Sequence, residues 1–176
     1  PAISWLDSYS EYAQEVEDWF SVHVDPRWGS LRDRAREVLA EDERIQQIIR
    51  LVGEDVLPDD QRLLAFTAFL VKSGYLQQGA FGPDSYSPPE KGFAILDLIL
   101  HFHEKCLGLV KKGVPLSLLK DGEPVDAITH LRELGAEDKK AFEDLRQRLD
   151  AHLDRVGAER TPQENRSGAG GDASWR

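Results

Sequence analysis

Apolar residues recur at intervals of three and four along most of the chain, and no segment alternates convincingly with a period of two. The first spacing places apolar side chains on one face of a helix, whereas the second is typical of strands. The pattern predicts helices over residues 8–23, 26–52, 59–75, 88–112, 114–120, 123–134 and 136–156. We therefore expect an all-α fold, a bundle of about six helices.

Local signals place several helix ends. Ser8 with Glu11, and Ser87 with Glu90, fit the capping box, in which each side chain bonds the backbone amide of the other residue. Pro88 then suits the first helical position of residues 88–112. Further start and stop signals of the second helix are Asp25, Pro26 and Gly53.

One of the predicted helices is expected to be central. Residues 59–75 are apolar nearly all round, and a helix that is apolar on all sides is normally buried. This segment should therefore be a central helix of the bundle. Residues 88–112 are apolar on two faces.

The two ends of the chain differ from the helical part. Residues 1–7, PAISWLD, form a short extended leader that resembles the middle of a longer chain more than the start of a fold. Residues 8–156 are the helical domain. Residues 157–176 have low hydrophobicity, several glycines and no periodicity, so we expect a disordered tail.

Composition narrows the class of partner. The 176 residues are 40% hydrophobic and carry a formal net charge of -10, which indicates a soluble domain and argues against nucleic acid or anionic membrane as partners. Proteins with basic surfaces remain compatible with this charge as partners. Cys106 is the single cysteine, which excludes an intrachain disulfide and favours a reducing compartment. The apolar run LLAFTAFLV is too short to insert into a membrane.

Catalytic signatures are missing. The chain has no GxxxxGK[ST], GxGxxG, HExxH, CxxC or GxSxG motif. His101 and His103 are two apart on a helix and should face different ways, which disfavours a shared metal ion. Cys106 lies among apolar residues and is interpreted as a core thiol. No catalytic or metal-binding residue is predicted.

Two loops carry unusual side chains. The stretch EDVLPDD contains Glu54, Asp55, Asp59 and Asp60 and is either a solvated turn that favours the next helix or a projecting acidic tip for a basic partner. The stretch YLQQGAF either tucks two rings into the core or presents them as a slot for a planar base.

Several stretches together resemble a known family. PAISWLDSYSEY, IQQIIRLVG, YLQQGAF and ILDLILHFHEK are similar, in order and spacing, to the C-terminal part of the catalytic A subunit of V-type and A-type ATP synthases and ATPases, over about residues 1–155. The resemblance implies that residues 1–7 end a nucleotide-binding domain and contain a hinge. It also implies that the phosphate loop and the Mg²⁺ ligands lie in another part of the parent protein, so this chain alone should not hydrolyse ATP.

The resemblance also implies two sites. In the family, an FLQQNAF loop folds back so that its aromatic residues flank the adenine of ATP or ADP. The corresponding residues here are Tyr75, Gln77, Gln78, Ala80 and Phe81. Tyr75 replaces the usual phenylalanine, and Gly79 replaces the usual asparagine, which removes a polar side chain.

The second implied site is the acidic turn. In the related β subunit of F-type enzymes, an acidic turn pushes on the rotating central stalk, and the matching residues here are Glu54, Asp55, Asp59 and Asp60. The implied partners are non-catalytic B subunits in an alternating hexamer and the central stalk, at a cytoplasmic location peripheral to the membrane. The alternative is a stand-alone acidic helical module that binds a basic protein without catalysis.

Overall fold

The computed structural model describes residues 12–77, 79, 85–135 and 139–160. The helices and helical turns of this part are α1 (Ala13–His23), α2 (Trp28–Val52), η1 (Glu54–Val56), α3 (Asp59–Leu70), η2 (Val71–Leu76), α4 (Pro89–Val110), α5 (Leu116–Leu119), α6 (Glu123–Thr129), η3 (Leu131–Glu133) and α7 (Lys139–Arg160). No strand occurs in these ranges, so the all-α prediction is confirmed.

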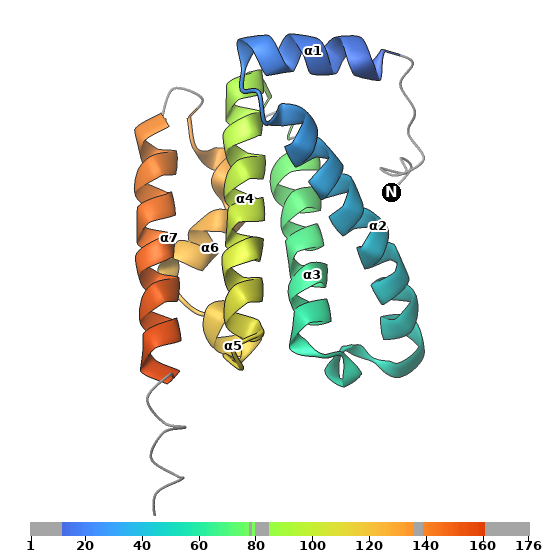
Figure 1. The fold of residues 1–176 in the computed structure, drawn as a ribbon, viewed down its shortest axis with the longest axis vertical. Coiled ribbons are helices and arrows are strands. Elements are labelled where there is room, and N and C mark those ends of the chain that lie inside the picture. Colours follow the sequence, from blue (N-terminus) through green and yellow to red (C-terminus); the bar gives the residue numbers. More distant parts are fainter. Residues whose placement is uncertain (1–11, 78, 80–84, 136–138, 161–176) are drawn as a thin grey trace, which may run out of the picture.

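The helices form a bundle with α3 and α4 in the middle (Figure 1). Helix α2 packs against α3 and α4 on one side, whereas α7 packs against α4 on the other, with α5 and α6 beside it. Helix α1 crosses one end of the bundle and contacts α2 (Figure 1). The prediction that residues 59–75 include a central helix is confirmed, and α4 shares this position.

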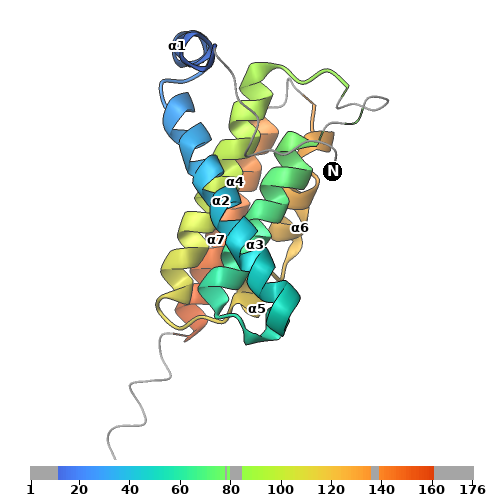
Figure 2. The same cartoon turned by 90° about the vertical axis from the view of Figure 1, so that its right-hand side faces the viewer.

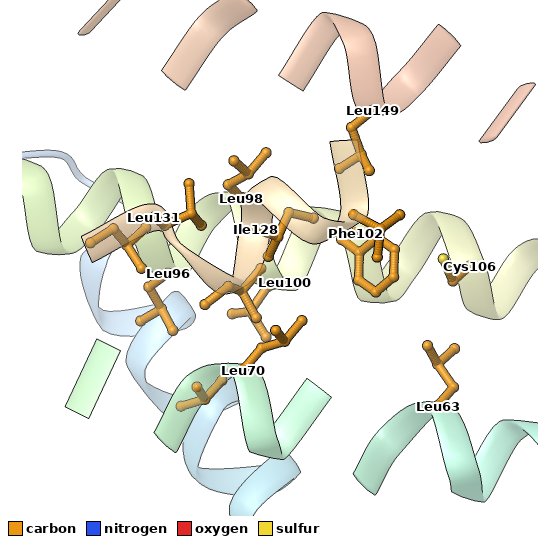
Figure 3. Close-up of a cluster of buried hydrophobic side chains, with 14 of the residues drawn as sticks. Leu63, Leu70, Leu96, Leu98, Leu100, Phe102, Cys106, Ile128, Leu131 and Leu149 are labelled. Carbon is orange, nitrogen blue, oxygen red and sulfur yellow. The ribbon is translucent and has the colours of Figure 1, made fainter. Parts of the chain in front are cut away.

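The core takes more of its buried side chains from α4 than from any other described helix, and α2, α3, α5, α6, η3 and α7 pack around it (Figure 3). Phe102 lies at its centre, fully buried, with its ring edge-on to Phe66 at 6.1 Å between ring centroids. Leu63 and Leu70 of α3, Ile128 of α6 and Leu149 of α7 are also less than 2% exposed. Burial of these apolar side chains is the main force that holds the helices together.

Helices α4 and α7 run in the same direction in fixed register. His101 pairs with Asp150 at 2.7 Å, Lys105 with Asp154 at 3.0 Å, and Asp97 with Arg146 at 2.6 Å. Each pair is separated by 49 residues, and successive pairs are four residues apart, which is one helical turn. A line of hydrogen-bonded polar pairs thus fixes how α7 lies on α4.

The predicted capping box of Ser87 and Glu90 does not form at the start of α4. The helix begins at Pro89, its N-cap is Pro88, and no side chain caps it, so neither Ser87 nor Glu90 plays the expected role. A proline disfavours helical backbone in the residue before it, and Pro88 accordingly has extended geometry with φ -66° and ψ 154°. The second of the two prolines therefore sets the start.

One further boundary differs from the prediction. Helix α2 begins at Trp28 because Asp25 accepts a hydrogen bond from the backbone N–H of Arg27 at 2.8 Å, which makes a turn before the helix. Gly53, with φ 87°, ends it as expected. The first predicted capping box, Ser8 with Glu11, lies outside the described residues.

The last helix is longer than predicted at its C-terminal end. Helix α7 continues through Gly157 to Arg160, so the first four residues assigned to the tail are helical. A Cβ atom at Gly157 would lie 2.7 Å from Leu109 Cδ2 of α4. The glycine therefore allows close packing between the two helices and does not stop α7. Residues 161–176 lie outside the described residues.

The end of the predicted helix 59–75 has an unexpected geometry. From Val71 to Leu76 the chain forms the π-helical turn η2, in which the N–H of Gln77 donates to the carbonyl of Lys72 at 3.0 Å. The wider turn directs Lys72 to the buried Asp42 of α2, with 2.5 Å between Lys72 Nζ and Asp42 Oδ2. Single π-helical turns are rare and often occur at functional sites.

Candidate functional site

The two regions singled out from the sequence lie at opposite ends of one helical rod. The acidic turn precedes α3, and η2 follows it, so the two are separated by roughly 25 Å at 1.5 Å of rise per residue. Figures 1 and 2 show them at opposite ends of the bundle in both views. They cannot form a single site, although one rigid element joins them.

Tyr75 of η2 is half-buried and packs closely on α4. A Cβ atom built on Gly92 would lie 3.4 Å from Tyr75 Cε2, so the ring rests against the glycine backbone. Removal from water raises the pKa of the Tyr75 hydroxyl, because the phenolate would be poorly solvated there. At neutral pH the side chain is therefore an uncharged aromatic wall.

A pocket of about 340 Å³ opens beside Tyr75. Its other walls include Pro88, Pro89 and the rings of Phe20 and Trp28, which stack at 4.3 Å between centroids with an angle of 17°. Aromatic rings and prolines line the pocket together with Ser87 and other polar atoms, which suits a flat group with a polar edge. Sequence reasoning missed Phe20 and Trp28, because they come from α1 and α2, far from the loop along the chain.

The structure describes only part of the predicted adenine pocket. Gln77 is exposed and is not among the residues that line the pocket beside Tyr75. Gln78, Ala80 and Phe81 lie outside the described residues. The structure therefore places Tyr75 at an aromatic pocket and leaves its convergence with Phe81 as a prediction.

The acidic turn divides into two kinds of carboxylate. Glu54, Asp55 and Asp60 are exposed, as a contact surface requires. Asp59 is partly buried, and its Oδ2 accepts a hydrogen bond from the backbone N–H of Leu116 at 2.8 Å. Because Leu116 is the first residue of α5, Asp59 satisfies a free amide at a helix start and ties the turn to the bundle.

His101 and His103 face different helices, as predicted from their spacing. His101 faces α7, where Nε2 bonds Asp150 and Nδ1 lies 3.1 Å from Arg146 Nη2. Burial raises the pKa of Asp150, but the hydrogen bonds from His101 and Lys105 outweigh this, so the pKa lies below its ordinary value. His103 faces α3 instead.

His103 is 4% exposed, and its Nδ1 lies 2.8 Å from the hydroxyl of Thr67. That hydroxyl donates its proton to the carbonyl of Leu63 at 2.9 Å, so Nδ1–H of His103 must be the donor in the first bond. Burial lowers the pKa of His103, and the nearby Arg34 lowers it further against a smaller opposite effect of Glu104. The ring is therefore held neutral.

The free energy of unfolding should depend on pH because of His103. Below its ordinary pKa of 6.5 the unfolded chain takes up a proton that the folded chain excludes, so the free energy of unfolding should fall as the pH drops below about 6.5. Urea titrations between pH 7 and pH 5 measure this. The variant His103→Gln should flatten this dependence, whereas His130→Gln, at an exposed position, should retain it. An unchanged slope in His103→Gln would contradict the assignment.

Cys106 is fully buried, and burial raises the pKa of its thiol to about 12. A thiol that stays protonated at neutral pH is a poor nucleophile.

Within the described ranges no cluster of three or more His, Cys, Asp or Glu side chains could hold a metal ion. No helix in the same ranges is long and apolar enough to cross a bilayer.

Known proteins resemble this chain over most of its length. The family model described as the C-terminal domain of V and A type ATP synthase matches residues 17–120. The V-type ATP synthase alpha chain of Halothermothrix orenii is 39% identical over 158 residues, which is 89% of this chain and 27% of that protein. The A subunit of the A-type ATP synthase from Methanopyrus kandleri is 36% identical over the same length.

A third relative is the corresponding A subunit of the A-type ATP synthase from Pyrococcus abyssi, which is 43% identical over 117 residues. That match covers 66% of this chain and 12% of the relative. The chain thus spans about a quarter or less of the length of these relatives.

Proposed function

The chain belongs to the family of C-terminal domains of V and A type ATP synthases, and on that premise we propose that it acts within the catalytic A subunit of a proton-translocating rotary ATPase. In this role the chain does not carry out the chemistry of ATP hydrolysis or synthesis. It supplies one wall of the nucleotide site and transmits the state of that site to the rotor.

The nucleotide-facing part of the proposal is the end of η2. Tyr75, Gln77, Gln78, Ala80 and Phe81 form the adenine side of the site, with the ring of Tyr75 already packed against Gly92. The pocket beside it, with Phe20 and Trp28, has the aromatic lining that a purine needs. The bound ATP or ADP supplies the reacting phosphates, and Mg²⁺ is held by residues outside this chain.

The rotor-facing part is the acidic turn. Glu54, Asp55, Asp59 and Asp60 face a basic surface of the central stalk, to which their charge is complementary. Non-catalytic B subunits alternate with the parent protein in a hexamer, on the cytoplasmic side and without inserting into the membrane. Closure of the helical domain on the nucleotide then moves the turn as a rigid-body displacement.

The observation that carries the proposal is the placement of Tyr75 and the acidic turn at the two ends of α3. A continuous helix resists bending, so a shift at one end is delivered to the other. The Asp42–Lys72 ion pair and the Asp59–Leu116 hydrogen bond fasten the two ends of the rod to α2 and α5. Both fastenings favour a domain that moves as one body.

The test is the variant Tyr75→Ala in the complete rotary complex. Stacking on an aromatic ring contributes about 1–3 kcal/mol per base, so the KM for ATP should rise on the order of tenfold. Tyr75→Phe keeps the ring and should keep the KM. Tyr86→Ala removes a tyrosine that is 82% exposed, and its KM should stay unchanged.

Steady-state ATP hydrolysis by the purified complex gives these constants. A KM for Tyr75→Ala within twofold of the unmodified complex would remove Tyr75 from the nucleotide site. Circular dichroism of the isolated variant chain checks that the half-buried ring is not needed for folding.

A further inference from the structure

The acidic turn carries exposed apolar side chains as well as acids. Leu51 is 84% exposed, Val52 54% and Val56 68%. Scattered exposed apolar residues are common on protein surfaces, but these three lie within six consecutive residues at one end of the bundle. We call Leu51, Val52 and Val56 the apolar tip.

The backbone around the apolar tip is held firmly. Gly53 adopts φ 87°, which only glycine reaches without strain, and so reverses the chain directly after Val52. Leu57 is 7% exposed and fixes the far side of η1 in the bundle. With Asp59 bonded to Leu116, both sides of the turn are attached, and the side chains between them project outward.

The charged side chains near the apolar tip are mostly acidic. Glu54 and Asp55 lie within the turn, and Asp60 lies just after it, all exposed. The nearest base along α2, Arg50, is directed back along the helix, where its Nε donates to the carbonyl of Gln46 at 3.2 Å. The turn thus presents exposed apolar side chains close in sequence to exposed carboxylates.

We propose that the apolar tip, rather than the carboxylates, makes the main contact of this domain with the rotating stalk. The inference rests on the proposed function and specifies its partner surface: apolar side chains of the stalk, bordered by lysine or arginine. Charge complementarity selects this partner, because the acids around the tip repel an acidic surface and attract a basic one.

A physical argument favours the apolar side chains as the main contact. Exposed charges are screened by salt within about 8–10 Å and contribute little when they remain in water. Apolar contact is short-ranged and less sensitive to salt, and it adds close packing that transmits displacement. Asp59, one of the four acids, already has one oxygen bonded to the Leu116 amide and is less free to pair with a partner.

The experiment compares two triple variants in the complete rotary complex. The apolar variant is Leu51→Asn, Val52→Thr and Val56→Thr, and the matched acid variant is Glu54→Gln, Asp55→Asn and Asp60→Asn. All six side chains are exposed, so neither variant should disturb folding, which thermal unfolding of the isolated chain verifies. The measured quantity is the number of protons pumped per ATP hydrolysed, at low and at high salt.

We expect the apolar variant to lower this ratio about tenfold and the acid variant to lower it less than twofold, with little change between the two salt concentrations. A loss in the acid variant that equals or exceeds the loss in the apolar variant overturns the inference and leaves the proposed stalk contact standing. An undiminished ratio in both variants contradicts the stalk contact itself, and the inference with it.

Discussion

Replacing Phe102 with alanine should lower the free energy of unfolding by about 3–5 kcal/mol, the usual cost of removing a buried phenylalanine ring. The ring belongs to α4, is fully buried and lies edge-on to Phe66 of α3 (Figure 3). The neighbouring helices are joined by other core contacts and cannot collapse fully into the space left behind. Urea unfolding followed by tryptophan fluorescence measures the loss.

A matched control for Phe102 is present in α3. Phe69 is 55% exposed, so Phe69→Ala should change the free energy of unfolding by less than about 1 kcal/mol. Total stabilities of single domains are about 5–15 kcal/mol, so Phe102→Ala can leave a barely folded chain. Phe102→Leu then provides a smaller, measurable loss. Equal losses in Phe102→Leu and Phe69→Leu would refute the placement of Phe102 at the core.

Replacing Lys72 with methionine should be the most damaging change to a polar side chain, at about 3 kcal/mol, the lower part of the range for breaking a buried ion pair. Asp42 is 1% exposed, with one oxygen bonded to Lys72 and the other to Gln46 at 3.0 Å. Without Lys72 its charge stays buried with only an amide partner. Urea unfolding at pH 7 gives the cost.

The reciprocal variant provides the control. The side chain of Lys72 is 37% exposed, so in Asp42→Ala the ammonium group can turn to water, and the loss should be smaller. The double variant Asp42→Ala with Lys72→Met should be more stable than Lys72→Met alone, because it leaves no buried charge. A double variant less stable than either single variant would contradict this account of the pair.

Periodicity was sufficient to predict the helices, because each helix buries one face and its apolar positions recur at the helical spacing. Helix starts were harder to predict, because several groups compete for the first free amides. At α4 the effect of Pro89 on Pro88 prevailed over the capping box of Ser87 and Glu90, and at α2 Asp25 bonded an amide before the helix. The π-helical turn had no signal of its own in the sequence.

The candidate site was predictable only where its residues are close in sequence. Tyr75 was identified from its loop, but the opposing rings of Phe20 and Trp28 come from other helices and required the fold. Asp59 resembled its three acidic neighbours in sequence, and only the position of Leu116 distinguishes it. The exposed apolar tip was missed because apolar residues at the end of a predicted amphipathic helix are expected to face the core.

The burial of Cys106 has a practical consequence for labelling. It is the only cysteine among the 176 residues, and with its pKa raised to about 12 it should react with maleimides far more slowly than an exposed thiol. Within this chain, a cysteine introduced at Val56 or Gln77 would therefore take a fluorophore in preference to Cys106. The buried thiol thus leaves the chain a silent background on which the two ends of α3 can be followed by energy transfer.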